Sequence, residues 1–143
     1  MIALDTNILV YAHRRDSAFH VPALETLARL GNGTAHWAIP WPCVHEFLSV
    51  VTHPRIYLPP TPIETALDFL ENWLQSKSLF LLSEGDTHFG QLSRLAREAK
   101  LAGPRVHDAR IAALCIAHAV EVLLTADRDF SRFPALKTRN PLI

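Results

Sequence analysis

Short, mostly apolar runs alternate with longer amphipathic segments from one end of the chain to the other. Such runs are typical of buried strands, and they occupy residues 1–4, 34–39, 79–82 and 121–126. Between them apolar residues recur at helical spacing, which predicts helices over residues 6–13, 19–33, 42–52, 61–76, 87–103 and 106–120. Strands that are apolar on both faces and separated by helices predict an α/β fold, with a central, mostly parallel sheet flanked by helices.

Capping and breaking residues predict where some of these helices begin and end. Thr61 is expected to cap the fourth helix, with Pro62 in its first turn and Glu64 three residues after the cap. The fifth helix is expected to end near Gly103. The residues after the last strand are expected to form a short irregular tail.

The size and composition are those of a single domain over residues 1–143, large enough to bury a substantial core. No apolar stretch is long enough to span a bilayer, so no membrane partner is expected. The opening "MIALDTNILVYAHRR" lacks the features of a signal peptide. Cys43 and Cys115 give neither zinc spacing nor a disulfide framework, and free thiols suit the cytoplasm.

The formal net charge is zero, but the charges are distributed unevenly. From Arg94 onward there are 9 basic and 5 acidic residues, whereas residues 1–93 hold 5 basic and 9 acidic ones. Zero net charge disfavours a protein that binds polyanions over its whole surface, while a local patch that faces phosphate is compatible with the basic second part. Ordinary fluctuation of charge along a chain explains the same counts.

Four acidic residues are expected to meet at one edge of the sheet. In open α/β sheets ligands bind at the carboxyl ends of the strands, and Asp5 directly follows the first strand as Asp127 follows the fourth. Glu46 falls in the second turn of the third helix. Asp108 falls in the first turn of the sixth helix and shares a face with Ile111, which places it along a buried stripe.

Each acid taken singly also has a structural interpretation. Asp5 is suited to cap the helix that follows it, Asp127 to form a turn, and Glu46 and Asp108 to complement helix dipoles. Four partly buried carboxylates together, however, would repel one another and be driven towards the protonated form. Mg²⁺ or Mn²⁺ relieves that repulsion, prefers oxygen ligands and binds phosphate oxygens, which predicts hydrolysis of a phosphoryl compound by a metal-activated water.

The motifs that hold these acids resemble those of a known family. "LDTN" at the start, a helical glutamate near residue 46, "HDARIAAL" and "LLTADRDFSRF" are similar to the motifs of PIN-domain ribonucleases, and more narrowly to VapC-type toxins of bacterial toxin–antitoxin pairs. The resemblance covers essentially the whole chain. It implies a three-layer PIN-like fold, a homodimer, a cognate antitoxin and an RNA substrate. The antitoxin's tail would fill a groove near the acids.

The resemblance also implies roles for individual residues. The family's acidic quartet, which binds one or two Mg²⁺ or Mn²⁺ ions, matches Asp5, Glu46, Asp108 and Asp127. Residues with accessory roles match Asp129, Thr6, Asn7 and Thr125. Among the quartet, Glu46 has rivals, because glutamate spacing varies in the family and Glu25, Glu64 and Glu71 lie in the same part of the chain.

Arginines flank the acidic motifs and are candidates for contacts to RNA phosphates. They are Arg105, Arg110, Arg128 and Arg132. Surface ion pairs are the alternative interpretation of each. His107 adjoins Asp108 and is a candidate for a substrate contact or, alternatively, an ordinary residue at a helix start. Cys43 begins a helix without a histidine partner, which favours a structural role.

Two other classes of protein compete with this interpretation. A flavodoxin-like phosphohydrolase or receiver domain also clusters aspartates at strand ends, but Asn7 stands where a D-x-D nucleophile motif needs its second acid. A receiver needs an aspartate at the end of its third strand, and Glu84 and Asp86 lie too far into the following loop. An inert PIN-like protein that acts only by binding would be favoured by an incomplete quartet, whereas all four acids are present.

Overall fold

Five short parallel strands form the centre of the computed structural model, which describes residues 1–143. The strands are β1 (Ile2–Leu4), β2 (Trp37–Pro40), β3 (Leu79–Leu82), β4 (Val122–Leu124) and β5 (Thr138–Arg139). They lie in the order β3-β2-β1-β4-β5, so β1 is the central strand. Each neighbouring pair is parallel, which confirms the predicted sheet.

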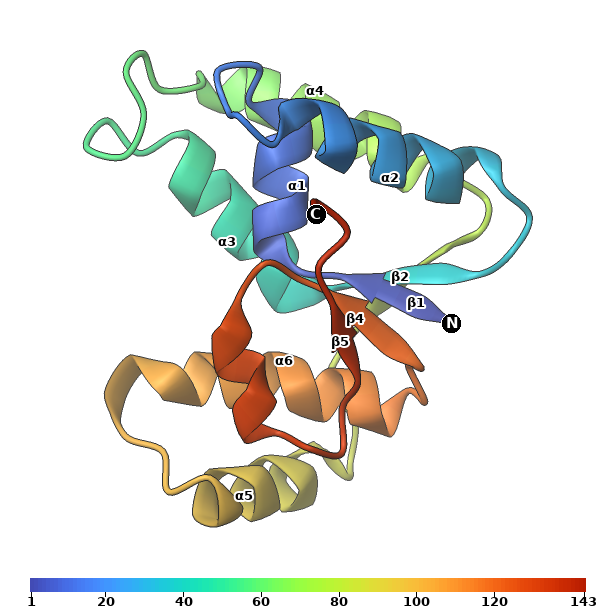
Figure 1. Cartoon of the computed structure of the whole chain (residues 1–143), viewed down its shortest axis with the longest axis vertical. Helices are drawn as coiled ribbons and strands as arrows, with labels where there is room; N and C mark the ends of the chain where they lie inside the picture. Colours follow the sequence, from blue (N-terminus) through green and yellow to red (C-terminus); the bar gives the residue numbers. More distant parts are fainter.

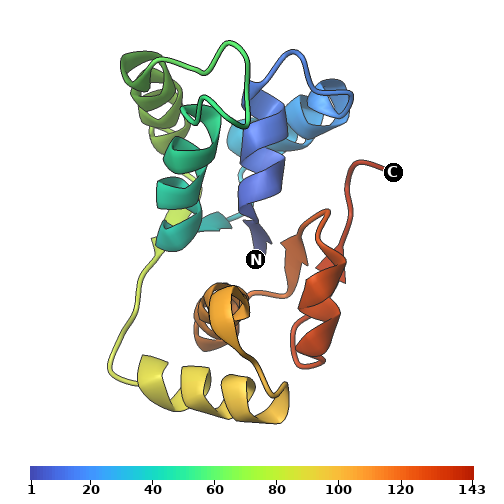
Figure 2. The same cartoon turned by 90° about the vertical axis from the view of Figure 1, so that its left-hand side faces the viewer.

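Helices cover both faces of this sheet, so the molecule has three layers (Figure 1). One face carries α1 (Thr6–His13), α2 (His20–Asn32), α3 (Trp41–Val51) and α4 (Ile63–Leu74). The other carries α5 (His88–Glu98) and α6 (Val106–Ala117), as the turned view in Figure 2 also shows. Two 3₁₀ helices, η1 (Gly103–Arg105) and η2 (Arg128–Arg132), precede α6 and follow β4. None of these helices combines the length and the apolar character that a membrane crossing requires.

The path of the chain creates a switch point between β1 and β4. From β1 the chain passes through helices on one face to β2 and then β3, and it returns over the other face through α5 and α6 to β4, on the opposite side of β1. The connections that leave β1 and β4 therefore diverge, and such a point is where open α/β sheets bind ligands. The backbone N–H of Asp5 donates to the carbonyl of Leu124 (3.0 Å), which keeps the two strand ends adjacent.

A cluster of 31 buried apolar residues packs the layers together. The largest of its fully buried side chains include Trp37 in β2 and Phe47 in α3. Phe130 and Phe133, whose ring centroids are 6.1 Å apart, anchor η2 and the residue after it to this core. These two phenylalanines therefore fix the loop after β4.

The prediction that Thr61 caps α4 is wrong. The helix begins at Ile63 with Pro62 at the N-cap position, and no side chain caps it. The hydroxyl of Thr61 instead lies 2.9 Å from Nε2 of His13 and accepts a hydrogen bond from Arg14 (3.2 Å). Thr61 is buried because His13 and Arg14, at the end of α1, contact it. These residues lie some fifty positions away in the sequence, so no local pattern predicts the contact.

The structure also corrects two predicted ends. The fifth helix ends at Glu98, well before Gly103, and the chain turns at Lys100, whose φ is +52°. The segment after β4 is not an irregular tail, because it holds η2 and a fifth strand, β5. That strand is two residues long and exposed, so no apolar pattern marks it.

His13 should make the stability of the protein depend on pH. Its ring packs edge-on against Phe69 and Phe47, and burial, together with the nearby Arg14 charge, lowers its pKa. The unfolded state therefore binds a proton at this histidine more readily, and the contribution of His13 to the free energy of unfolding should fall as pH drops through the unfolded histidine pKa of about 6.5. In urea unfolding with EDTA, His13→Phe should lose less stability over this range than the unchanged protein. His36→Gln, an exposed control, should behave like the unchanged protein, and equal losses in all three would exclude His13 as the titrating group.

Candidate functional site

Four carboxylates line one cavity of about 230 Å³ at the switch point. Asp5 follows β1, Glu46 lies in the second turn of α3, Asp108 lies in the first turn of α6, and Asp127 follows β4. The acids thus come from the ends of two neighbouring strands and from one helix on each face of the sheet. The other lining residues are Thr6, Asn7, Val10, Tyr11, Val50, Tyr57 and Ile111.

Asp5 is the most buried of the four acids, with only 4% of its surface exposed. Its Oδ1 accepts from the backbone N–H of Thr6 (2.8 Å) and from the thiol of Cys43 (3.7 Å), and its Oδ2 accepts from the hydroxyl of Thr125 (2.7 Å) and the amide of Asn7 (3.3 Å). Burial raises the pKa of Asp5 to about 6 in spite of these hydrogen bonds, and the charges of Glu46 and Asp127 add to the rise. Asp5 also caps α1, so its structural interpretation holds at the same time.

Thr125 connects the two strand ends through its hydroxyl. The hydroxyl donates to Asp5 and accepts from the backbone N–H of Asp127 (2.9 Å) and from the Asn7 amide (3.2 Å). The Asn7 side-chain oxygen in turn accepts from the backbone N–H of Ala126 (3.2 Å). The loop after β4 is therefore held against the start of α1, which fixes Asp127 relative to Asp5.

Glu46 differs from the expectation of a partly buried acid, because it is exposed at the mouth of the cavity. Its Oε2 accepts a hydrogen bond from the hydroxyl of Thr6 (2.7 Å), which ties α3 to the first residue of α1. The rival glutamates Glu25, Glu64 and Glu71 lie on α2 and α4, and none of them lines the cavity.

A second grouping of acids overlaps the first. Asp108, Asp127 and Asp129 each place one carboxylate oxygen within 4.8 Å of the others. Burial raises the pKa of Asp108, and the charges of Asp127 and Asp129 raise it further. Asp127 also accepts from the backbone N–H of Asp129 (2.8 Å), so it is Asp127, and not Asp129, that caps η2.

The four predicted arginines fall into two groups. Arg105 forms an ion pair with Asp129 (3.2 Å), and Arg110 forms one with Glu84. Arg128 and Arg132 are exposed and make no ion pair. Arg105 and Arg110 thus form the surface ion pairs that the alternative interpretation predicts. Contacts of the four arginines with RNA remain predictions.

Besides the acids, Thr6 and Asn7 of the cavity wall were predicted from the sequence, whereas Tyr11 and Tyr57 were not. Tyr57 reaches the cavity from the loop between α3 and α4, and the Arg14 guanidinium lies 4.2 Å from its ring centroid. Arg14 is itself held by two hydrogen bonds to Asp16 (2.9 and 2.6 Å) and one to the carbonyl of Pro59 (3.0 Å). No local pattern encodes these contacts.

Cys43 is fully buried, and burial raises the pKa of its thiol well above the usual range, in agreement with a structural role.

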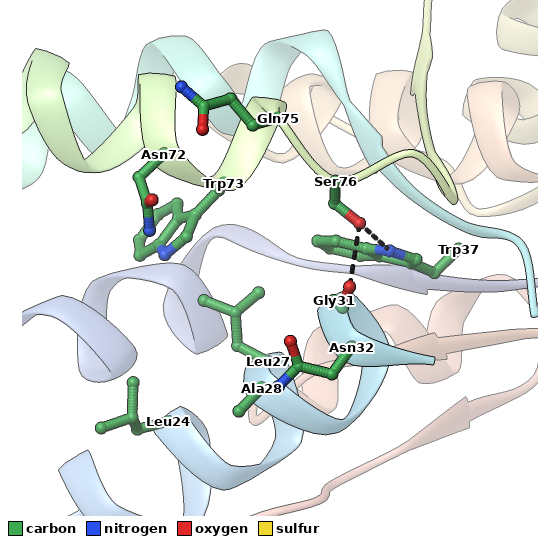
Figure 3. Close-up of a pocket in the computed structure, with 10 residues that line it drawn as sticks. All are labelled: Leu24, Leu27, Ala28, Gly31, Asn32, Trp37, Asn72, Trp73, Gln75 and Ser76. Atoms are coloured by element: carbon green, nitrogen blue, oxygen red, sulfur yellow. Dashed lines mark hydrogen bonds between the residues drawn. The ribbon is translucent and has the colours of Figure 1, made fainter. Parts of the chain in front are cut away.

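A larger hollow, of about 380 Å³, lies between α2 and α4 beside Trp37 (Figure 3). Within it the Ser76 hydroxyl accepts from the Trp37 indole N–H (3.3 Å) and donates to the Gly31 carbonyl (3.2 Å). Its lining holds no acid, histidine or cysteine and shares no residue with the acidic cavity. The chemistry of the site therefore belongs to the smaller, acidic cavity.

The donor set of the acidic cavity fits a hard divalent cation. The side chains that converge there offer carboxylate, hydroxyl and amide oxygens, and the nearby Cys43 sulfur is kept protonated by burial. The raised pKa values of Asp5 and Asp108 are what repulsion and burial produce where no positive charge compensates the acids. These residues can therefore hold Mg²⁺ or Mn²⁺.

Comparison with known proteins assigns this architecture to a family. The model of the PIN domain matches residues 2–136. Ribonuclease VapC43 of Mycobacterium tuberculosis is 32% identical over 142 residues, which cover 99% of this chain and 96% of the relative. Ribonuclease VapC48 of the same organism is 30% identical over 137 residues, with 96% and 94% covered. A chain of VapBC2 from Rickettsia felis, solved bound to a DNA fragment from its promoter, has a TM-score of 0.68 at 26% identity, with 98% of both chains covered. The chain belongs to the PIN-domain family and, within it, to the VapC ribonucleases.

Removal of the Thr125 hydroxyl should weaken both the fold and the site. Thr125→Val removes the shorter of the two hydrogen bonds to Oδ2 of Asp5 and leaves the backbone N–H of Asp127 without its acceptor, which should cost about 1–3 kcal/mol of unfolding free energy. The variant should also bind Mg²⁺ roughly 10- to 100-fold more weakly, because its valine no longer orients Asp5 and Asp127 by hydrogen bonds. Urea unfolding and calorimetric titration measure the two effects. Thr125→Ser should restore both, Thr138→Val at an exposed position should change neither, and an unaffected Thr125→Val would contradict the role of the hydroxyl.

Mg²⁺ should stabilise the protein more at neutral than at acidic pH. The folded pKa of Asp5 is about 6, above the value of about 3.9 in an unfolded chain. The buried negative charge therefore lowers the free energy of unfolding by its full amount above pH 6, and this loss disappears when pH falls below the pKa of the unfolded chain. A cation offsets this charge only when Asp5 is ionised. The rise in Tm with Mg²⁺ should therefore be larger at about pH 7.5 than at about pH 5. Asp5→Asn should abolish most of the rise and Asp68→Asn, a control on α4, should retain it. A rise that does not depend on pH would contradict binding through Asp5.

Proposed function

We propose that this protein is a metal-dependent endoribonuclease, the toxin of a toxin–antitoxin pair, and that it acts in the cytoplasm. The observation that carries the proposal is the convergence of Asp5, Glu46, Asp108 and Asp127 on one cavity at the switch point of the sheet. Membership of the VapC ribonucleases supports RNA as the substrate.

Asp5 and Asp108 would hold the main Mg²⁺ or Mn²⁺ ion, and Asp127 and Glu46 would complete its surroundings directly or through water. When bound, the ion would supply a Lewis acid that lowers the pKa of water for attack on phosphorus and stabilises the charge on the phosphoryl group. The chain's contribution is to keep the acids ionised and in place. Thr125 and Asn7 serve this by donating to the carboxylate of Asp5.

Thr6 and Asp129 would have accessory roles. The Thr6 hydroxyl donates to Glu46, which limits the freedom of an otherwise exposed side chain at the mouth of the cavity. Asp129 is partly neutralised by Arg105, and its carboxylate lies beside Asp108 and Asp127. Asp129 would therefore act by adjusting the charge around Asp108 or through a bridging water, while Arg105 would limit the repulsion among the acids.

The competing functions find less support. A receiver domain would need a reactive acid at the end of β3, where Glu84 is bound to Arg110 and neither Glu84 nor Asp86 lines the acidic cavity. A flavodoxin-like phosphohydrolase would need a second acid after β1, where Asn7 stands. An inert binding protein would not need four carboxylates around one hollow, two of them with raised pKa values, because their burial reduces stability.

A cognate antitoxin and a second copy of the chain are the protein partners that we propose. The related VapBC2 of Rickettsia felis was solved as a toxin–antitoxin assembly bound to promoter DNA. An antitoxin segment close to the acidic cavity would inhibit the enzyme by excluding the substrate or by offering a cation to the carboxylates. Such inhibition needs no change in the fold of the toxin.

RNA cleavage should require the divalent ion and the four acids. We expect cleavage of single-stranded RNA with Mg²⁺ and none with excess EDTA. Asp5→Asn and Asp108→Asn should lose at least about 100-fold in kcat/KM, since a ligand is replaced by a neutral amide. Asp127→Asn should cost more activity than Asp129→Asn, because Asp127 lines the cavity while Asp129 is paired with Arg105.

Matched controls are available on α4. Asp68→Asn and Glu71→Gln remove exposed carboxylates of the same types, away from the cavity, and should retain full activity. Cleavage that persists in EDTA or in Asp5→Asn would overturn the metal–carboxylate mechanism. Cleavage of single-stranded DNA alone would overturn the choice of substrate.

A further inference from the structure

Another hollow, of about 310 Å³, lies between α3 and α6 and adjoins the acidic cavity. Glu46 and Ile111 line both hollows, so the two lie next to each other at this edge of the sheet, and together we call them the trough. The residues that line only the second hollow are Pro42, His45, Ser49, His107 and Arg110. We call it the α3–α6 hollow.

The two halves of the trough have opposite hydrogen-bonding character. The acidic cavity presents carboxylates, which accept hydrogen bonds and attract cations. The α3–α6 hollow presents two imidazoles, a hydroxyl and a guanidinium, from His45, His107, Ser49 and Arg110. These groups can donate hydrogen bonds to phosphate and ribose oxygens.

The side chain of Arg110 is held while much of its donor capacity stays free. Its Nε donates to Oε1 of Glu84 at the beginning of the loop after β3, and 44% of the side chain is exposed. The two terminal nitrogens form no other hydrogen bond or ion pair. Because one edge of the guanidinium is fixed, less side-chain entropy is lost when the other edge binds an anion. Across the hollow, the ring of His45 packs edge-on against Trp41, with centroids 6.3 Å apart.

We infer that the α3–α6 hollow binds the phosphate of the nucleotide next to the cleaved bond of a single-stranded RNA. The inference rests on the proposed function, because it uses the acidic cavity as the place of cleavage. A free phosphate dianion fits the hollow less well, since Glu46 on its border repels a double negative charge. A phosphodiester carries one charge, and its neighbour in the chain is held in the acidic cavity.

The inference predicts a defect in RNA binding, with cleavage chemistry preserved. Arg110→Ala should raise KM for a single-stranded oligoribonucleotide roughly 10-fold, the effect of one lost charge-assisted hydrogen bond, with kcat within about twofold. The slope of log(kcat/KM) against log salt should become shallower by about 0.7, the value for one phosphate contact to a single strand. His107→Ala and His45→Ala should raise KM by less than Arg110→Ala, because an imidazole offers fewer hydrogen-bond donors than a guanidinium.

Two further variants separate binding from structural effects. Arg97→Ala removes an exposed arginine on α5 that lines neither hollow and should match the unchanged protein. Glu84→Gln keeps the charge of Arg110 but weakens its anchor, so it should raise KM less than Arg110→Ala and keep the salt slope. Thermal unfolding and Mn²⁺ binding should be the same in all these variants as in the unchanged protein.

The outcomes distinguish this inference from the proposed function. If the unchanged protein cleaves RNA and Arg110→Ala behaves like Arg97→Ala, the inference about the α3–α6 hollow is wrong and the proposed function stands. The inference is equally wrong if Arg110→Ala lowers kcat and leaves KM and the salt slope unchanged. If the unchanged protein cleaves no RNA under any metal condition, the proposed function fails and the inference fails with it.

Discussion

The burial of one carboxylate at the end of the central strand is the constraint on which the site depends. Asp5 is almost inaccessible to solvent, and taking an ionised carboxylate out of water costs several kcal/mol unless the charge is compensated. Hydrogen bonds from Thr6, Asn7 and Thr125 offset part of this cost, and the pKa still rises to about 6. Near neutral pH the fold therefore holds a negative charge that its own residues do not balance. Such a charge lowers the stability of the fold unless a cation compensates it.

The hydrogen bonds around Asp5 also explain why the other acids lie where they do. Thr125 is 120 positions away in the sequence, yet its hydroxyl binds Asp5 because β1 and β4 are neighbours in the sheet. The helices that follow β2 and precede β4 lie on opposite faces, so Glu46 and Asp108 approach the same strand ends from opposite sides. The positions of all four carboxylates are thus consequences of strand order.

The helices, four of the strands and the acids could be predicted because their signals are local. Apolar runs, helical spacing and the rule that ligands bind beyond strand ends are each visible within a few residues, and they located Asp5 and Asp127. Long-range contacts carry no such signal. The burial of Thr61 depends on His13, and the place of Tyr57 in the cavity wall depends on Arg14. β5 was missed because backbone groups alone join it to β4, through bonds such as that from the Thr125 N–H to the Arg139 carbonyl (3.0 Å).

The distribution of charge indicates how such a protein would hold RNA. Its net charge is zero, and Arg105 and Arg110 are each paired with an acid, so its long-range attraction of a polyanion is weak. At physiological salt the field of a single charge is also screened within about 8 Å. Affinity would then have to come from directed contacts made after encounter. The trough has the chemistry for such contacts, because carboxylates that favour a cation lie beside imidazole, hydroxyl and guanidinium donors that favour phosphate. Directed contacts depend on the shape and spacing of the strand, whereas long-range attraction does not. An enzyme built this way would discriminate among RNAs by geometry, at the expense of a fast, indiscriminate association.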